Sequence, residues 1–148
     1  MNAGTINCSS FVTIKGGNTN SAVLKGGDIN CGGDLTFSSG ALLTIAGTKQ
    51  GSATFNDIGG TLSRININFM LGTRVKLTLT NPADTAWAET IWTNGQLKYN
   101  GQDYTTLGDW STVTKWNALG GYQRFDFTSN TLSLAYDPPP AATSIIIR

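Results

Sequence analysis

The chain has 148 residues, enough for one domain with its own core, and Gly, Thr, Asn and Ser supply 63 of them, which is typical of short strands and turns. Only 13% of the residues are charged and the net charge at pH 7 is +1, so neither nucleic acid nor anionic lipid is favoured as a partner. Histidine is absent, which excludes Ser-His-Asp and Cys-His catalysis and histidine zinc sites.

Short groups of alternating apolar residues predict a series of strands between residues 11 and 80. Their period of two is that of a strand with one buried face. Turns rich in Gly, Asn and Ser separate the groups, at residues 15–18, 25–28, 38–40 and 57–60. The groups are Val12 and Ile14, Leu35 and Phe37, Leu43 and Ile45, Ala53 and Phe55, then Leu62, Ile65 and Ile67, and finally Val75, Leu77 and Leu79.

An internal repeat indicates how these strands are arranged. Residues 12–21 align with residues 22–31 at an offset of ten, with apolar, Lys, Gly-Gly and Asn positions in step. A stacked parallel β-solenoid needs such repetition, because each coil meets equivalent positions in its neighbours. The sequence therefore favours an all-β single domain over residues 1–148, with a short parallel β-solenoid over residues 1–80. A β-sandwich or jelly roll is the alternative.

The two cysteines test this arrangement. Cys8 and Cys31 are 23 residues apart. If one coil takes about that many residues, the two would stack in adjacent coils ~4.8 Å apart, within the Cα range of a disulfide. They are therefore a disulfide candidate, with buried free thiols as the other interpretation.

The composition changes after residue 80, since all four tryptophans and all four tyrosines lie beyond it. Residues 97–104 predict a strand, an Asn-Gly hairpin turn and a second strand, and residues 124–136 predict another hairpin. An open solenoid end is an exposed sheet edge. We therefore expect residues 81–136 to form an aromatic-rich cap over that end.

These segments carry a family resemblance. Residues 33–47 resemble the repeating units of bacterial autotransporter passengers and related β-helical surface adhesins, and the hairpins at 97–104 and 122–134 resemble the way such passenger segments end. The resemblance implies an extracellular or cell-surface β-helical protein that adheres, scaffolds or polymerises. It implies neither a catalyst nor a cofactor.

The tryptophans support a second functional hypothesis, because flat aromatic faces stack on sugars. Under it the chain is a carbohydrate-binding β-sandwich module, although burial in a core or cap explains the same residues. The candidates for glycan binding are Trp87, Trp92, Trp110 and Trp116.

Catalysis and metal binding have weaker signals. Glycoside hydrolysis needs two carboxyl groups that flank the bond, and Glu89, Asp103 and Asp109 lie near tryptophans. Most acids adjoin turns, so we predict no catalytic residues.

The motif Gly-Gly-Asp occurs at residues 26–28 and 32–34. It is similar to calcium-binding β-roll repeats but is present in too few copies, so we expect solvated turn aspartates and no metal.

Residues 137–148 combine a proline-rich spacer with a terminal strand. Three prolines force an extended spacer, and Ile145, Ile146 and Ile147 form a β-prone apolar end. This strand either pairs within its own fold or adds to the open edge of a second copy. Such addition builds a fibre when the rotation between neighbouring copies does not close into a ring.

The predicted function is a non-enzymatic extracellular or cell-surface structural or adhesive protein. Its predicted partners are further copies of itself and surface glycans, without membrane insertion.

Overall fold

A computed structural model describes residues 4–16, 21–60, 64–103 and 105–139, and this part of the chain is mostly β. Its helices are α1 (Trp87–Thr93), α2 (Trp110–Val113) and the 3-10 helix η2 (Thr105–Leu107). None of the helices in these ranges is long and apolar enough to cross a membrane. The strands are β1 (Thr5–Cys8), β2 (Val12–Ile14), β3 (Ser21–Leu24), β4 (Gly27–Cys31), β5 (Leu35–Phe37), β6 (Leu42–Ile45), β7 (Gly51–Phe55), β8 (Ile58–Gly59), β9 (Ile67–Phe69), β10 (Val75–Leu79), β11 (Leu97–Tyr99), β12 (Gln102–Asp103), β13 (Gln123–Thr128) and β14 (Thr131–Tyr136).

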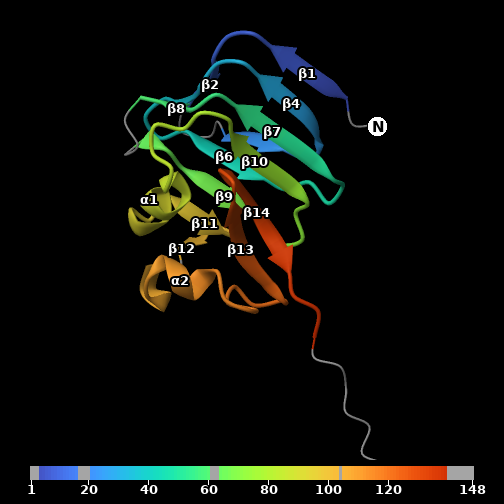
Figure 1. Cartoon of the computed structure of the whole chain (residues 1–148), viewed down its shortest axis with the longest axis vertical. Helices are drawn as coiled ribbons and strands as arrows, with labels where there is room; N and C mark the ends of the chain where they lie inside the picture. The colour runs from blue at the N-terminus through green and yellow to red at the C-terminus, as the bar shows by residue number, and fades with distance from the viewer. Residues whose placement is uncertain (1–3, 17–20, 61–63, 104, 140–148) are drawn as a thin grey trace, which may run out of the picture.

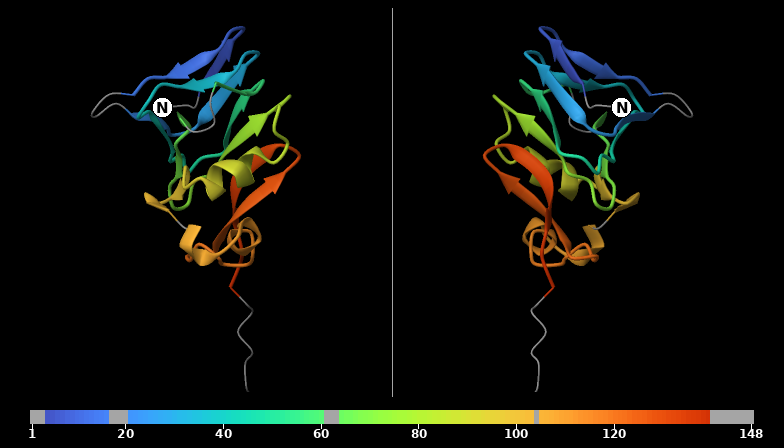
Figure 2. Two further views of the ribbon diagram at one scale, coloured as in Figure 1. Left: turned by 90° about the vertical axis from the view of Figure 1, so that its left-hand side faces the viewer. Right: turned by 90° about the vertical axis from the view of Figure 1, so that its right-hand side faces the viewer.

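The first ten strands enter three sheets in rotation. One sheet contains β1, β4, β7 and β10 side by side, a second contains β2, β5 and β8, and a third contains β3, β6 and β9. Figure 1 shows β1, β4, β7 and β10 stacked in that order, and the side views of Figure 2 show the same layers. All pairs among these ten strands are parallel, whereas a β-sandwich predicts antiparallel pairs.

Paired positions in neighbouring layers are separated by a nearly constant number of residues. Thr5 pairs with Asp28 and Val12 with Leu35, an offset of 23, and Leu43 pairs with Ile67, an offset of 24. The ten-residue repeat found in the sequence instead relates β2 to β3, which lie in different sheets. It therefore relates successive sides of one layer, while the spacing of about 23 residues relates one layer to the next.

Apolar side chains fill the space between the three sheets in continuous columns. Ile45 pairs with Phe69 and Ala53 with Leu77, and all four are buried. The outward side chains form polar columns, in which the Thr13 and Thr36 hydroxyls lie 2.7 Å apart and Asn56 Nδ2 donates to Asp34 Oδ1 at 2.9 Å. The alternation seen in the sequence thus separates core from surface in each layer.

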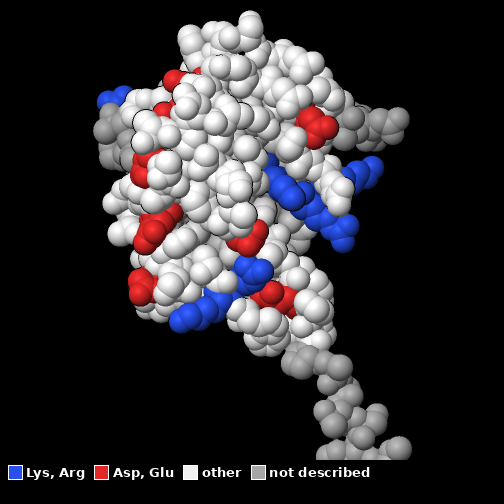
Figure 3. All heavy atoms as spheres, in the orientation of Figure 1, with Lys and Arg blue, Asp and Glu red and all other residues white. Residues whose placement is uncertain are grey.

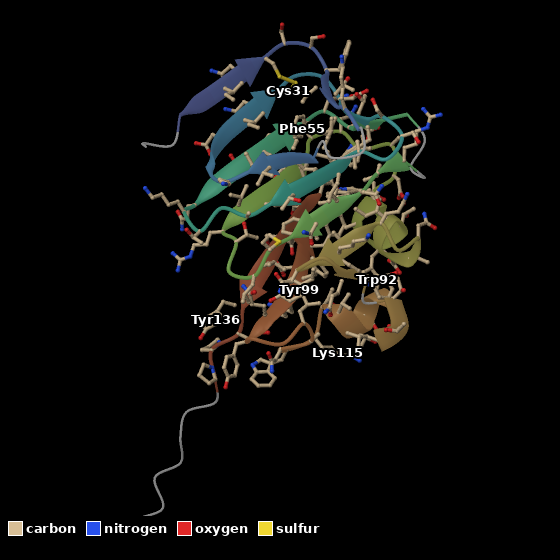
Figure 4. The ribbon with its side chains drawn as sticks, turned by 180° about the vertical axis from the view of Figure 1, so that it is seen from behind. Cys31, Phe55, Trp92, Tyr99, Lys115 and Tyr136 are labelled. Atoms are coloured by element: carbon tan, nitrogen blue, oxygen red, sulfur yellow. A yellow bond between two sulfur atoms is a disulfide. The ribbon has the colours of Figure 1, made fainter. Side chains whose placement is uncertain are left out.

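The two cysteines occupy paired positions at the ends of β1 and β4. Their Cα atoms are 4.6 Å apart and a disulfide joins them, near the top of the stack in Figure 4. This bond ties the outermost strand of the sheet to the next layer.

The C-terminal part covers the other end of the stack. Both expected hairpins are present: β11 pairs with β12, and β13 pairs with β14. The second hairpin extends the first sheet, because β14 pairs antiparallel with β10. Leu62, Tyr104 and Ile145, Ile146 and Ile147 lie outside the described residues.

The helices α1 and α2 are a correction to a cap expected to consist of hairpins alone. Helix α1 buries Trp87, Ala88, Ile91 and Trp92, which lie on one helical face. The Asp84 carboxylate accepts hydrogen bonds from Ala86 N at 2.8 Å and Thr90 Oγ1 at 2.6 Å and so fixes the start of the helix. Seven residues are too short for the helical period to stand out in the sequence.

The close approach of adjacent layers at Gly47 yields a first prediction. A Cβ atom there would lie 2.6 Å from the Lys25 carbonyl oxygen and 2.6 Å from Val75 Cγ2. We expect Gly47→Ala to lower the free energy of unfolding by about 1–3 kcal/mol, because the layers must separate to accept the methyl group. Gly32→Ala is the matched control, since its Cβ would meet nothing closer than 3.8 Å. Chemical denaturation of both variants measures the difference, and equal midpoints would contradict the close packing.

The disulfide yields a second prediction. Closing the loop between Cys8 and Cys31 restricts the unfolded chain, so replacing both by Ser should lower the free energy of unfolding by roughly 3 kcal/mol. Thermal melts with and without reductant provide the measurement. Reductant should lower the melting temperature of the wild type and leave that of the double variant unchanged.

Candidate functional site

The N-terminal end of the stack, formed by β1, β2 and β3, leaves its sheets open; we call it the open end. Each of these strands is the last in its sheet among the described residues. Ile6 pairs with Ile29, which pairs with Ala53, which pairs with Leu77. Burial decreases along this inward column, from the buried Leu77 and Ala53 through the half-buried Ile29 to Ile6, which is 60% exposed. The open end therefore presents core positions to solvent.

An apolar hollow of about 110 Å³ lies within the first layers at this end. It is lined by aliphatic side chains, among them Val12, Ile14, Ala22, Leu24, Ile29 and Leu35. Phe11 and Val23 are also exposed there. An unpaired strand edge beside uncovered apolar side chains is a template for pairing with another strand.

The opposite end is covered by aromatic side chains. The Phe125 ring packs edge-on against Phe69 at a centroid distance of 5.9 Å and stacks on Trp110 at 6.0 Å. Trp87 packs edge-on against Phe127 at 5.3 Å. The two ends therefore differ: one is closed by its own chain, and the other has no cover among the described residues.

The structure divides the four candidate tryptophans. Trp87 and Trp92 are buried, so they are not available to stack on a glycan, which corrects that part of the expected ligand set. Trp110 is half-buried between Trp92 and Phe125. Only Trp116 lies on the surface, with 54% of its area exposed.

Trp116 belongs to a group that the sequence analysis missed, which we call the aromatic cluster: Trp116, Tyr122 and Tyr136. The Tyr122 ring lies 6.1 Å from that of Trp116 and 6.3 Å from that of Tyr136. Figure 4 shows Tyr136 at the end of the molecule opposite Cys31. The three residues are spread over the sequence, and the pairing of β13 with β14 together with the hydrogen bond from Asn117 N to Asp137 brings them together.

The carboxyl groups considered for catalysis have structural partners or lie exposed. Asp103 Oδ1 accepts a hydrogen bond from Thr105 N at 2.9 Å, and Glu89 is exposed on α1. The Ser111 hydroxyl, 2.6 Å from Asp109 Oδ1, lowers the pKa of Asp109, with a further contribution from Thr112. A general acid needs the opposite shift.

The aspartates of the two Gly-Gly-Asp segments are hydrogen-bonded between layers. Asp28 Oδ1 accepts from Ser52 N at 3.0 Å and Ser52 Oγ at 2.9 Å, and Asp34 accepts from Asn56. Within the described ranges no three His, Cys, Asp or Glu residues gather where they could hold a metal ion. The two aspartates are therefore not free turn residues but links in the polar columns.

A shallow groove over β4, β7 and β10 carries the basic side chains Arg74 and Lys76, with Asp28 at its edge. Figure 3 shows that Lys and Arg side chains form a short band on this face, whose remaining surface is largely uncharged. The polar side chains that line the groove are all exposed, so none of them is a buried group aimed at a ligand.

Comparison of the chain with protein-family models, with curated proteins and with solved structures finds no match.

Proposed function

We propose that the protein is a non-enzymatic structural or adhesive subunit of the extracellular space or cell surface that self-associates at its open end. Its body is then a short, three-sided parallel β-solenoid. The observation that carries the proposal is the exposure of Ile6 at the end of an inward column whose other members become progressively buried. The disulfide between Cys8 and Cys31 and the low share of charged residues support an extracellular setting.

Covering the open end is energetically favourable for two reasons. Full burial of an Ile or Phe side chain contributes roughly 1.5–3 kcal/mol, and both Ile6 and Phe11 are exposed there. A strand added beside β1 would also satisfy the unpaired backbone groups of its outer edge. Cover by a second copy supplies both effects at once.

The occupant we propose is the C-terminal segment of a second copy, residues 143–148. Pairing of β14 with β13 ends at Tyr136, and the exposed Pro138 and Pro139 lack the N–H groups needed to continue it. The nine residues after Pro139 span roughly 30 Å when extended. The open end and the origin of this segment lie at opposite ends of the molecule, so addition runs head to tail and extends into a filament.

A charged substitution at the open end tests the proposal. We expect Ile6→Lys to prevent self-association, because a buried unpaired ammonium is unfavourable at the interface. It should leave the fold of the single copy intact, since Ile6 is largely exposed there. Light scattering coupled to size-exclusion chromatography, with electron microscopy, should find assemblies of the wild type and single copies of the variant.

Leu107→Lys is the matched control, because Leu107 is an exposed leucine in η2 of the cap. It should assemble like the wild type. Single copies of the wild type at all concentrations, or equal assembly of the Ile6→Lys variant, would refute self-association at the open end.

Deletion of residues 143–148 tests the proposed occupant separately. We expect the truncated chain to remain folded and not to assemble with itself, because it lacks the donor strand. It should still terminate filaments of the full chain, since its open end accepts their C-terminal segment. Filament lengths in mixtures, measured by electron microscopy, provide the test, and unchanged assembly of the truncated chain alone would exclude this segment as the donor.

A further inference from the structure

We infer that the aromatic cluster is a binding site for a neutral glycan, and that it recognises the pyranose rings by stacking. The site lies at the capped end, away from the open end (Figure 4). The inference adds a ligand to the proposed structural function and does not depend on self-association.

The cluster presents three large rings to solvent next to one another. Trp116 is 54% exposed, Tyr122 38% and Tyr136 63%. The interplanar angle is 66° between Trp116 and Tyr122 and 73° between Tyr122 and Tyr136, so the rings pack edge to face. In this arrangement each of the three rings keeps part of its area open to solvent.

Hydrogen bonds to one buried carboxylate hold the cluster in place. Asp137 Oδ2 accepts from Asn117 N at 2.9 Å, and Asp137 N donates to the Tyr122 carbonyl at 2.7 Å. Tyr122 N in turn donates to Asn117 Oδ1 at 2.6 Å. The segment that carries Trp116 and Tyr122 is thereby fixed to the end of β14, next to Tyr136. Such preorganisation lowers the entropic cost of binding.

The backbone of Tyr122 has an unfavourable conformation that the surrounding hydrogen bonds must hold in place. Its φ is 59°, in the left-handed region that is unfavourable for a bulky side chain. The hydrogen bonds to Asn117 and Asp137 maintain this conformation. The Tyr122 ring is therefore held between the other two rings with part of its surface in solvent. Exposing this ring does not stabilise the fold.

The acidic side chains next to the cluster are already paired. Asp137 is paired with Arg124, whose Nε lies 3.1 Å from Asp137 Oδ1 and whose Nη1 lies 3.2 Å from Asp126 Oδ1. Partial burial lowers the pKa of Arg124, but the hydrogen bonds to the two carboxylates outweigh this effect and raise it, so the guanidinium stays charged and engaged. What is left for a ligand is the ring faces and the exposed Lys115, directly before Trp116. A neutral sugar matches both, since its apolar C–H face stacks on the rings and its hydroxyl groups accept hydrogen bonds from an ammonium group.

The size of the cluster favours a glycan over a protein partner. With about 200 Å² for each ring-bearing side chain, the exposed fractions correspond to roughly 300 Å² of aromatic surface. A specific protein interface takes about 800 Å² from each partner. A patch of the observed size matches a few sugar rings.

The experiment is a titration of the full-length chain with neutral oligosaccharides, followed by tryptophan fluorescence. The probes are oligomers of β-linked glucose, N-acetylglucosamine, mannose, xylose and galactose. Trp116 is the tryptophan most exposed to solvent, so ring stacking on it should shift the emission. The Ile6→Lys variant is titrated in parallel, which separates glycan binding from assembly.

We expect at least one oligosaccharide to bind saturably, and Trp116→Ala and Tyr136→Ala each to weaken binding at least tenfold. Trp116→Phe should restore part of the affinity, since a flat ring returns, and circular dichroism checks that each variant is folded. Leu107→Ala is the matched control, because it removes an exposed apolar side chain of the cap outside the aromatic cluster and should leave the affinity unchanged. Where Trp116→Ala alters the fold, Tyr136→Ala at the strand end carries the test.

Three results would overturn the inference. The first is the absence of saturable binding to every oligosaccharide. The second is equal weakening by Leu107→Ala. The third is loss of assembly in Trp116→Ala without any glycan binding by the wild type, which would assign the cluster to a protein contact. None of these affects the assignment of the open end, which is tested by Ile6→Lys alone.

Discussion

The structure depends on one constraint: in the stacked sheets, an inward side chain is buried most fully where a layer lies on each side of it. Columns such as Ile45 with Phe69 meet this condition because paired positions recur after a nearly constant number of residues. The layers must also approach closely, which explains why glycine stands at Gly47 against the Lys25 backbone. In a stack of this kind each inner layer is covered by its two neighbours, and only the layers at the two ends need another cover. Both functions that we propose are located at those ends.

The two ends of the stack differ in how they are covered. At the C-terminal end, Trp87, Trp92 and Phe125 fill the space above the last layer, and β14 continues the sheet in the antiparallel sense. At the N-terminal end, a disulfide secures the outermost strand to the next layer but does not cover Ile6. A covalent bond keeps an edge strand in place without burying its side chains. It thus preserves an edge in the conformation needed for pairing, which supports a role for that edge in assembly.

Much of the body follows from the sequence. Val12 with Ile14, Ala53 with Phe55 and Val75 with Leu77 alternate because one side faces the core, and strands β2, β7 and β10 lie where these residues predict them. The turns of the two hairpins follow from local chemistry, since Asn100, Gly101, Ser129 and Asn130 all adopt the positive φ that such turns require. Strand β4 was not predicted, because Asp28 and Asn30 on its outer side are residue types typical of turns. Their partners, Ser52 and Asn7, are distant in sequence.

The candidate sites were harder to predict because aromatic residues have the same sequence signature in a core and on a surface. Trp92 and Trp116 cannot be distinguished by type, yet Trp92 is buried on the inner face of α1 and Trp116 lies on the surface. The difference arises from tertiary pairing: Tyr136 ends β14, and Asp137, directly after it, binds the segment that carries Trp116. In the sequence, an aspartate followed by three prolines gives no sign of this role. The residue directly after β14 thereby orders an exposed aromatic surface, so the end of this strand and the surface that presents three rings to solvent are held together by the same hydrogen bonds.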